Sequence, residues 1–322
     1  MNYRLKVPNI RYLTVEKLTF AYILITSLII VITRYGTYSG FELLKYRLII
    51  ACIIIALAYV NNIKDGWIIR ILRVAFLGGL LSYWYPETYE INRALPNFDF
   101  ILANFEQSIF GFQPAFVFSK HFTQLWFSEL MNMGYFLYYP LIIGTALYFY
   151  FANPKYFGLF FFTVLFSFYL YYIIYIIFPT AGPQYYYYAI GMDNVLSGNF
   201  PEVGYYFNYH NTLLANHDNS GYFYHLVENT QLLGERPTAA FPSSHVGIST
   251  IIMIMIARYK KYFVFELLFP IYLILVASTV YIQAHYFVDV IMGFVSAFVF
   301  YFLSVAIYKK INRVDMFRYI KP

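Results

Sequence analysis

The chain has 322 residues, of which 61% are hydrophobic and 23% aromatic, while only 12% are charged. So few charged groups exclude a water-soluble globular protein and indicate a protein of the lipid bilayer. The formal net charge of +6 does not indicate a nucleic-acid partner, because membrane topology accounts for the basic residues.

Eight hydrophobic runs are candidates for membrane-spanning helices, since each is close to the length that crosses the hydrocarbon core. Two of them, 46–60 and 244–257, are short and need flanking residues or an oblique path. We therefore expect an all-α fold, a polytopic membrane helical bundle with about eight transmembrane helices. The runs are 18–34, 46–60, 67–85, 130–151, 157–178, 244–257, 262–282 and 286–308.

The distribution of Lys and Arg predicts the orientation, because these residues stay preferentially on the cytoplasmic side. With both termini in the cytoplasm, most of the 22 Lys and Arg residues lie on that side. The opposite side keeps Arg34, Lys45, Arg47, Arg93, Lys120 and Arg236.

The composition, rich in Ile, Tyr and Phe, suits an AT-rich bacterial genome and thus a bacterial inner membrane.

We divide the chain into residues 1–129, with the first spans and an interfacial segment, and residues 130–322, a transmembrane core. Two long stretches do not span the membrane, and both are expected outside the cytoplasm. The stretch 86–129 contains FDFILANFEQSIFGF and FSKHFTQLWF, which predict helices lying along the headgroups. The stretch 179–241 opens with PTAGPQYYYY and is expected to form an ordered extracytoplasmic loop.

The segment AHYFVDV places His285 and Asp289 four residues apart at the start of a predicted helix. One helical turn brings the carboxylate beside the imidazole, where it can accept the imidazole N–H. That bond leaves the lone pair of the other ring nitrogen pointing outward, as a nucleophile or a base requires. The alternative is a buried polar pair that joins two helices.

The segment FPSSHVG contains a second histidine, His245, at the start of another predicted helix. Pro242 suits the first turn, and Ser243 and Ser244 can cap it. A helix start presents N–H groups to an anion, so it can form a phosphate cradle. Arg236, just upstream, can offer a guanidinium to phosphate oxygens or be a solvated loop residue.

These two segments are expected at the same extracytoplasmic level of the membrane. Three ionisable groups that converge at one membrane depth are poorly explained by packing and favour a chemical role. The remaining histidines lack the spacing of a metal site, so we interpret them as exposed polar residues and expect no metal. They are His121, His210, His217 and His225, with Asp218 nearby.

The single cysteine, Cys52, lies within an apolar run. A lone cysteine excludes a disulfide framework and a thiolate metal site. Its position predicts a small buried hydrophobic residue.

The histidine motifs resemble those of a known family. PSSH at 242–245 followed by HYFVD at 285–289 is similar to the second and third signature motifs of the type-2 phosphatidic acid phosphatase superfamily of membrane lipid phosphatases and phosphotransferases. FPSSHVG, STVYIQAHYFVDVIMG and FPTAGPQYY are more similar to its inositol phosphorylceramide synthase and sphingomyelin synthase-like branch. The resemblance covers the chain from about Tyr156 onward.

The resemblance implies roles for three residues. His285 is the nucleophile that takes the phosphoryl group, and Asp289 orients and supports it. His245 is the general acid that protonates the leaving oxygen. The family chemistry passes through a phosphohistidine and needs neither a metal nor another cofactor.

Two cations of the family pattern are absent from this chain. Asn229 stands where the pattern has a lysine, and Ser278 with Thr279 stand where it has Ser-Arg. Arg236 is then the only candidate cation near the motifs. Fewer cations suit a phosphodiester, with one negative charge, better than a phosphomonoester, with nearly two.

The position of Arg236 leaves an alternative open. Its Arg-Pro stands closer to the second motif than the first family motif usually does. PTAGPQ, near residue 179, can occupy the place of the first motif instead, with Gln184 and Tyr185 as neutral hydrogen-bond donors. Gln283, close to His285, is another such donor.

The sequence therefore predicts a lipid phosphotransferase that moves a phospho-headgroup from a phosphodiester lipid to a lipid alcohol such as ceramide or diacylglycerol. The first alternative is a lipid phosphatase that hydrolyses phosphatidyl, polyprenyl or lipid A phosphates. A non-enzymatic lipid transporter is the second, and it predicts charged residues spread through the membrane depth. The oligomeric state does not follow from the sequence.

Overall fold

The computed structural model describes residues 10–34, 36–214 and 221–311, and these residues are almost entirely helical. Over this part of the chain the structure contains α-helices, a short 3-10 helix and loops, but no strand. The expected all-α class is therefore confirmed.

Six helices are long and apolar enough to cross a membrane by themselves. A seventh span can form from two helices that meet at a 43° bend, α6 (Leu125–Phe136) and α7 (Tyr138–Ala152). The apolar helix α12 (Ser244–Arg258) has only 15 residues. The eight predicted runs fall on these helices, although residues 178, 282 and 286 lie just outside them. The six are α1 (Thr14–Arg34), α2 (Tyr38–Ile63), α3 (Trp67–Asn92), α8 (Pro154–Ile177), α13 (Tyr262–Tyr281) and α14 (Phe287–Ile311).

Two of the predicted boundaries are wrong. The run 130–151 is not one straight helix, because the chain bends after Phe136. α3 does not end at residue 85 but continues through Pro86 to Asn92. A proline inside a helix removes one backbone N–H and one helical bond, and here the flanking turns of α3 continue the helix.

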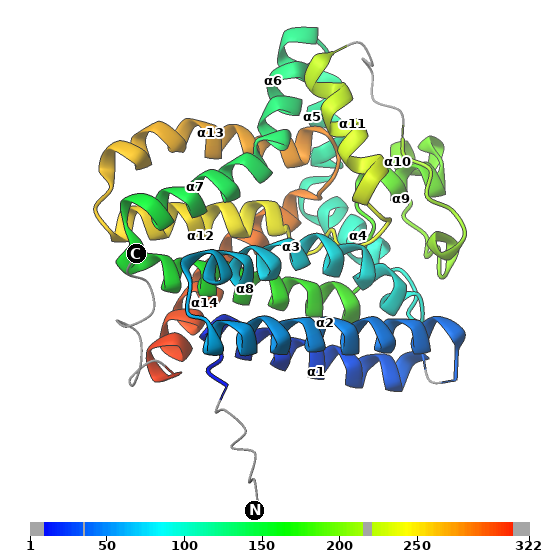
Figure 1. Cartoon of the computed structure of the whole chain (residues 1–322). Coiled ribbons are helices and arrows are strands. Elements are labelled where there is room, and N and C mark those ends of the chain that lie inside the picture. Colours follow the sequence, from blue (N-terminus) through cyan, green and yellow to red (C-terminus); the bar gives the residue numbers. More distant parts are fainter. Residues whose placement is uncertain (1–9, 35, 215–220, 312–322) are drawn as a thin grey trace, which may run out of the picture.

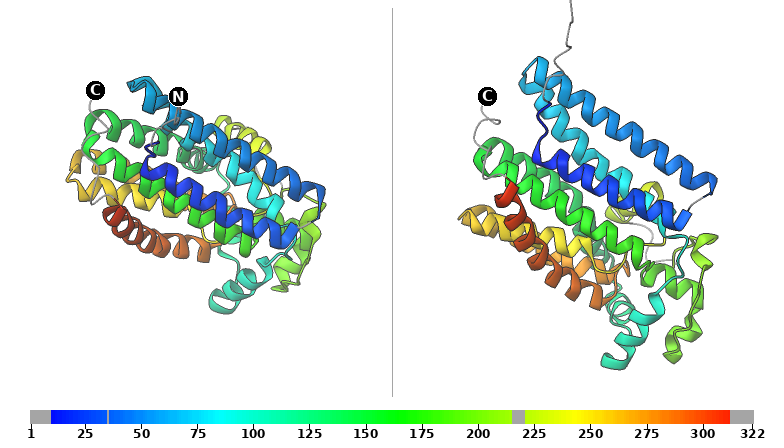
Figure 2. Two further views of the ribbon diagram at one scale, coloured as in Figure 1. Left: turned by 60° about the horizontal axis from the view of Figure 1, so that its bottom comes forward. Right: turned by 90° about the horizontal axis from the view of Figure 1, so that it is seen from below.

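The stretches outside the predicted spans form short helices at one end of the bundle, opposite to the end where α1 begins and α14 ends (Figures 1 and 2). Residues 86–129 contain two of the expected interfacial helices, although α6 already begins within this stretch. Residues 179–241 are more regular than the expected loop. The short helices are α4 (Asp99–Phe110), α5 (Pro114–His121), α9 (Pro183–Ile190), α10 (Met192–Ser197), η1 (Tyr206–Asn208) and α11 (Tyr222–Gly234).

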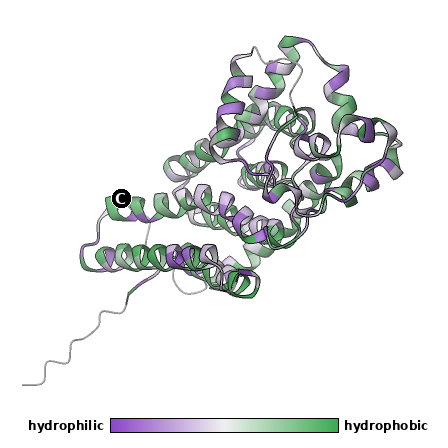
Figure 3. Ribbon diagram, turned by 90° about the vertical axis from the view of Figure 1, so that its right-hand side faces the viewer, coloured by the Kyte–Doolittle hydropathy of each residue, from purple (hydrophilic) through white to green (hydrophobic). Residues whose placement is uncertain are grey.

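α8 lies at the centre of the bundle, between the group α1 to α3 and the group α12 to α14 (Figure 2). It is apolar all round, which is typical of a buried helix. In an apolar stretch of 18 residues within it, 67% of the residues are buried. In α2 the buried share is only 22%. The long helices are largely hydrophobic (Figure 3), and many of their large apolar side chains are exposed, as is suited to contact with lipid tails. Cys52 on α2 is exposed, so the prediction of a buried cysteine is wrong.

Two buried ion pairs connect the first three helices. Arg47 on α2 pairs with Glu87 on α3, with 2.8 Å between Nη2 and Oε2. Arg73 on α3 pairs with Glu16 on α1, with 2.7 Å between Nε and Oε1. Both arginines were expected at membrane surfaces, but both are buried. A charge in this apolar environment is costly unless it has a partner, so each guanidinium is neutralised by a carboxylate of a neighbouring helix.

Breaking the Arg47–Glu87 pair is expected to destabilise the protein strongly. Glu87→Ala leaves a buried guanidinium without its carboxylate, which costs about 3–5 kcal/mol. Thermal unfolding in detergent should show a large fall in the midpoint, and Arg47→Met combined with Glu87→Gln should recover part of it. Glu42→Ala removes an exposed pair with Lys45 and serves as the control with little change. Equal midpoints for Glu87→Ala and the control would contradict this role.

Candidate active site

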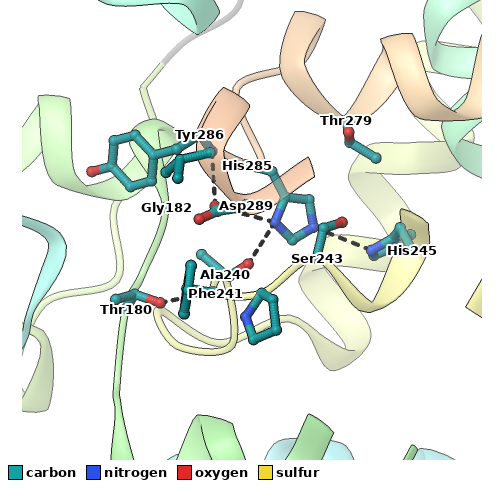
Figure 4. A network of polar contacts seen from close by, with 12 residues as sticks. Thr180, Gly182, Ala240, Phe241, Ser243, His245, Thr279, His285, Tyr286 and Asp289 are labelled. Atoms are coloured by element: carbon teal, nitrogen blue, oxygen red, sulfur yellow. Dashed lines mark hydrogen bonds and ion pairs between the residues drawn. The ribbon is translucent and has the colours of Figure 1, made fainter. Parts of the chain in front are cut away.

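The start of α12, the connection between α13 and α14, and the first turn of α14 bring two histidines and an aspartate together (Figure 4). His285 Nε2 lies 3.4 Å from His245 Nδ1, and His285 Nδ1 lies 3.5 Å from Asp289 Oδ2. Gly293 permits the close approach of α14 to α12, since a Cβ there would lie 2.5 Å from the Ser243 carbonyl oxygen. The three groups singled out in the sequence therefore share one site.

The imidazole of His285 is held mainly by a backbone carbonyl. His285 Nδ1 lies 2.8 Å from the oxygen of Ala240, which accepts its N–H. The expected acceptor, Asp289, is farther away, because its Oδ2 accepts the backbone N–H of Tyr286 at 2.8 Å. The N–H on Nδ1 leaves the lone pair of Nε2 directed toward His245.

His245 lies against two tyrosines that sequence reasoning missed. The rings of Tyr135 and Tyr138 have centroids 4.6 Å and 4.2 Å from that of His245. Tyr135 is on α6 and Tyr138 on α7, so the bend between these helices presents both rings to the imidazole. With 37 tyrosines in the chain, nothing in the sequence marks these two.

The predicted phosphate cradle at the start of α12 is not open in this structure. The N–H of Ser243 donates to the carbonyl oxygen of Asp289 at 3.1 Å, and that of Ser244 donates to Tyr175 Oη at 3.1 Å. Ser243 Oγ accepts the N–H of Val246 at 3.3 Å, as a capping residue does. Both serines therefore use these groups to hold the helix start, although Ser244 also lines the cavity described below.

The other candidate phosphate ligands are engaged elsewhere. Arg236 Nη1 donates to the carbonyl oxygen of Glu235 at 2.8 Å. Gln283 Nε2 donates to Ser119 Oγ on α5 at 2.8 Å. Tyr185 is buried against Phe207.

The loop histidines do not gather around the site. His225 pairs with Glu228 at the surface, His210 stacks on Tyr206, and His121 is exposed. Among the described residues, no group of three His, Cys, Asp or Glu side chains is placed to hold a metal ion. His217 and Asp218 lie outside the described residues.

Both catalytic candidates, His245 and His285, line a small cavity. Its volume is about 10 Å³, which holds a single water molecule. The binding of a lipid phosphate in this cavity therefore requires that the segments that line it move apart. The lining residues are Tyr85, Tyr135, Ala181, Glu235, Thr238, Ala239, Ala240, Ser244, His245, Ala284 and His285.

Glu235 is a functional candidate that sequence reasoning missed. Its carboxyl lines the same cavity as the histidines, and Gln184 Nε2 donates to Oε1 at 2.7 Å. Burial raises the pKa of Glu235 to about 7, although the hydrogen bond from Gln184 acts in the opposite direction. The sequence drew attention to the neighbouring Arg236, because a cation is the obvious ligand for phosphate.

Burial also determines the charge of His285. Removal from water lowers the pKa of His285 to about 4, although the Ala240 carbonyl and the nearby Glu235 act in the opposite direction. An exposed histidine titrates near 6.5. His285 is therefore neutral at pH 7, which is the form with a free lone pair on Nε2.

This pKa predicts that the folded protein loses stability as the pH falls from about 6.5 to 4. Over this range the unfolded chain binds a proton at His285 that the folded chain does not, so stability rises with pH. The contribution is on the order of 1 kcal/mol per pH unit. Thermal midpoints measured between pH 7 and 5 should fall more steeply for the unsubstituted protein than for His285→Gln. His225→Gln, at an exposed site, should follow the unsubstituted protein, and identical slopes for all three would refute the assignment.

The comparisons with known proteins agree with the two histidine motifs. Residues 101–303 match the family model described as the PAP2 superfamily, the type-2 phosphatidic acid phosphatases. The match covers more than half of the chain and begins in α4, well before the segment in which the sequence motifs were noticed. Searches of curated proteins and of solved structures gave no significant match. The chain therefore belongs to the PAP2 superfamily of membrane lipid phosphatases and phosphotransferases.

Proposed function

We propose that the protein transfers the phospho-headgroup of a phosphodiester lipid to a lipid alcohol, as a phosphosphingolipid synthase does, with His285 as the nucleophile. The observation that carries this proposal is the pairing of the two imidazoles in one cavity. Nδ1 of His285 is fixed by Ala240, and Nε2 faces His245 at 3.4 Å. This geometry supports one histidine as the attacking group and the other as the proton carrier.

In the first half-reaction, the lone pair of His285 Nε2 attacks phosphorus, and the bond from phosphorus to the leaving alcohol breaks. Protonated His245 gives its proton to the leaving oxygen. A covalent bond between Nε2 and phosphorus remains. The N–H of Nδ1, donated to Ala240, keeps the ring oriented during this step, and Asp289 at 3.5 Å stabilises the positive charge that develops on it.

In the second half-reaction, a hydroxyl of the acceptor attacks the phosphohistidine. Neutral His245 accepts the proton of this hydroxyl as the bond between phosphorus and Nε2 breaks. Glu235 lines the same cavity and has a pKa of about 7, which is close to the value that suits a general base. We therefore assign Glu235 a part in positioning the acceptor hydroxyl and in relaying its proton to His245.

The charges around the cavity support a phosphodiester as the donor. Its lining residues include the carboxyl of Glu235 but neither lysine nor arginine. A phosphomonoester has close to two negative charges at neutral pH, and this lining offers no permanently charged lysine or arginine to balance them. A diester has a single charge, which neutral hydroxyl groups of the lining, such as those of Tyr85, Tyr135 and Thr238, can stabilise.

The helix ends support the predicted orientation. Lys64, Lys155, Arg258 and Lys309 lie at or near the helix ends of the side where α1 begins, away from the cavity. Because lysine and arginine favour the cytoplasmic side, we infer that both termini are cytoplasmic and that the site faces the extracytoplasmic leaflet. The donor and the acceptor are then lipids of that leaflet.

Replacement of either histidine is expected to abolish transfer. His285→Ala removes the nucleophile and His245→Ala the proton carrier, so each variant should lose most of the turnover without unfolding. The assay supplies purified protein in lipid micelles with a headgroup-labelled phosphodiester lipid, with and without ceramide or diacylglycerol, and follows the label by chromatography.

Label in a new lipid only when an acceptor is present supports a transferase. Label released into water regardless of the acceptor indicates a hydrolase instead. Turnover that survives in His285→Ala would exclude the nucleophile assignment, and turnover of phosphomonoester lipids alone would exclude the phosphodiester donor.

Glu235→Gln is expected to slow the second half-reaction more than the first. The variant keeps the shape of the side chain but cannot take a proton, and loss of a general base costs about 10²- to 10⁴-fold. Phosphorus label from a donor labelled at phosphorus should therefore accumulate on the protein, as measured by rapid quenching under mildly alkaline conditions. Glu228→Gln, on the exposed side of α11, is the control. Unchanged transfer in Glu235→Gln would remove this residue from the mechanism.

A further inference from the structure

The helix α4 carries two buried carboxylates that the mechanism does not use. Asp99 and Glu106 are both fully buried, and both bind the backbone or a side chain next to His285. α4 itself lies outside the long apolar helices, in the stretch 86–129. The sequence predicts helices along the headgroups there but no function for them. A buried carboxylate is costly, so these two require an explanation beyond packing.

Asp99 connects the two segments on either side of His285. Its Oδ1 accepts the N–H of Gly182 at 2.8 Å and the hydroxyl of Tyr286 at 3.0 Å. Its Oδ2 accepts the N–H of Ala181. One carboxylate therefore binds both the loop before α9 and the residue that follows His285 in the chain.

The loop held by Asp99 also holds the carbonyl that orients His285. Next to Ala181, the carbonyl oxygen of Thr180 accepts the N–H of Ala240 at 3.0 Å, and its hydroxyl accepts the N–H of Phe241 at 2.9 Å. Ala240 in turn accepts the imidazole N–H (Figure 4). The contacts form a closed ring from Asp99 through Thr180 and Ala240 to His285, and back through Tyr286.

Close backbone contact reinforces this ring. Gly182 has a φ of +88°, which favours glycine, and a Cβ there would lie 2.5 Å from the carbonyl oxygen of Ala284. Gln184 N donates to the carbonyl oxygen of Gln283 at 2.8 Å. The loop and the His285 segment are thus in direct contact, and Asp99 is the side chain that binds both.

Glu106 acts on the other side of the same turn. Its Oε1 accepts the N–H of Val288 at 2.8 Å, one of the N–H groups at the start of α14 that have no partner within the helix. This contact fixes the first turn of α14, which contains Asp289. Glu106 and Asp99 are two turns apart on one helix, so α4 presents both carboxylates to the His285–Asp289 turn.

We propose that Asp99 and Glu106 are positioning residues for the reaction, and that α4 holds the nucleophile His285 in its attacking orientation. This inference rests on the proposed function of His285. The two carboxylates do not touch the cavity, so they act through Tyr286, Val288 and the Ala240 carbonyl. Their loss should reduce the rate of the chemical step and leave the binding of the lipid donor unchanged.

The test compares Asp99→Asn with Tyr286→Phe in the lipid-transfer assay. Asp99→Asn replaces one carboxylate oxygen with an amide nitrogen that cannot accept an N–H, so it breaks the closed ring of hydrogen bonds at this position. Tyr286→Phe removes only a single hydroxyl from it. We expect kcat to fall about 10- to 100-fold for Asp99→Asn and less for Tyr286→Phe, with KM changed little, because a small displacement of a reacting group is enough. A rise in KM at constant kcat would overturn the proposal.

Glu106 provides a matched pair of variants. Glu106→Gln keeps an oxygen that can accept the N–H of Val288, so its kcat should stay near that of the unsubstituted protein, whereas Glu106→Ala should lower it. Asp193→Asn, on the exposed surface of α10, is the control. Equal losses in Glu106→Gln and Glu106→Ala would show that the hydrogen bond is not what matters.

A second readout does not depend on turnover. Protein with ¹⁵N-labelled histidine, in detergent micelles, should show His285 with its proton on Nδ1, assigned by the loss of the signal in His285→Gln. In Asp99→Asn these ring signals should shift or broaden, while the thermal midpoint shows that the protein is folded. Unchanged ring signals in Asp99→Asn would overturn the positioning role even if the unsubstituted protein transfers no lipid. Shifted signals without turnover in any assay would instead count against the proposed function alone.

Discussion

The hydrogen bond from His285 to the Ala240 carbonyl is the contact on which the site depends. A buried imidazole in an apolar bundle is neutral, and it can be a nucleophile only if its proton is on the nitrogen that does not face the substrate. A carbonyl oxygen can only accept, so it enforces this tautomer on Nδ1. Any change that moves Ala240 therefore alters both the direction of the Nε2 lone pair and whether Nε2 carries the proton.

Much of the surrounding structure keeps this carbonyl and this ring in place. The loop at Thr180 holds Ala240, and the start of α14 is held by its own Asp289 and by Glu106. Within the described part of the chain, Gln283 Oε1, Glu106 Oε2 and Asp289 Oδ1 are buried without a hydrogen-bond partner. Buried acceptors without partners are rare in proteins. Here three of them surround the turn that carries His285, and none of the three residues lines the cavity.

The sequence was sufficient to predict the helices, because hydrophobic runs report on local geometry, and the meeting of the histidine motifs, because the predicted topology places both at one membrane level. It did not predict the acceptor of the His285 N–H, because backbone carbonyls leave no mark in a sequence. It also missed Glu235 and the bend that brings Tyr135 and Tyr138 to His245, since these depend on how distant segments meet. The cradle at Ser243 and Ser244 was a sound expectation for an isolated helix start, but tertiary partners, Tyr175 and the Asp289 carbonyl, use those N–H groups.

The contacts of α4 bear on how the chain is divided. The sequence suggested a boundary at residue 129, which places α4 with the first spans. Asp99 and Glu106 instead bind the turn that carries His285, and the family match begins at residue 101. The ion pairs of Arg47 and Arg73 connect α1 to α3 with one another, and none of their four residues lines the cavity. We therefore propose that α4 belongs to the catalytic unit, and that the first three helices form a layer that packs on α8 and contributes Tyr85 of α3 to the cavity.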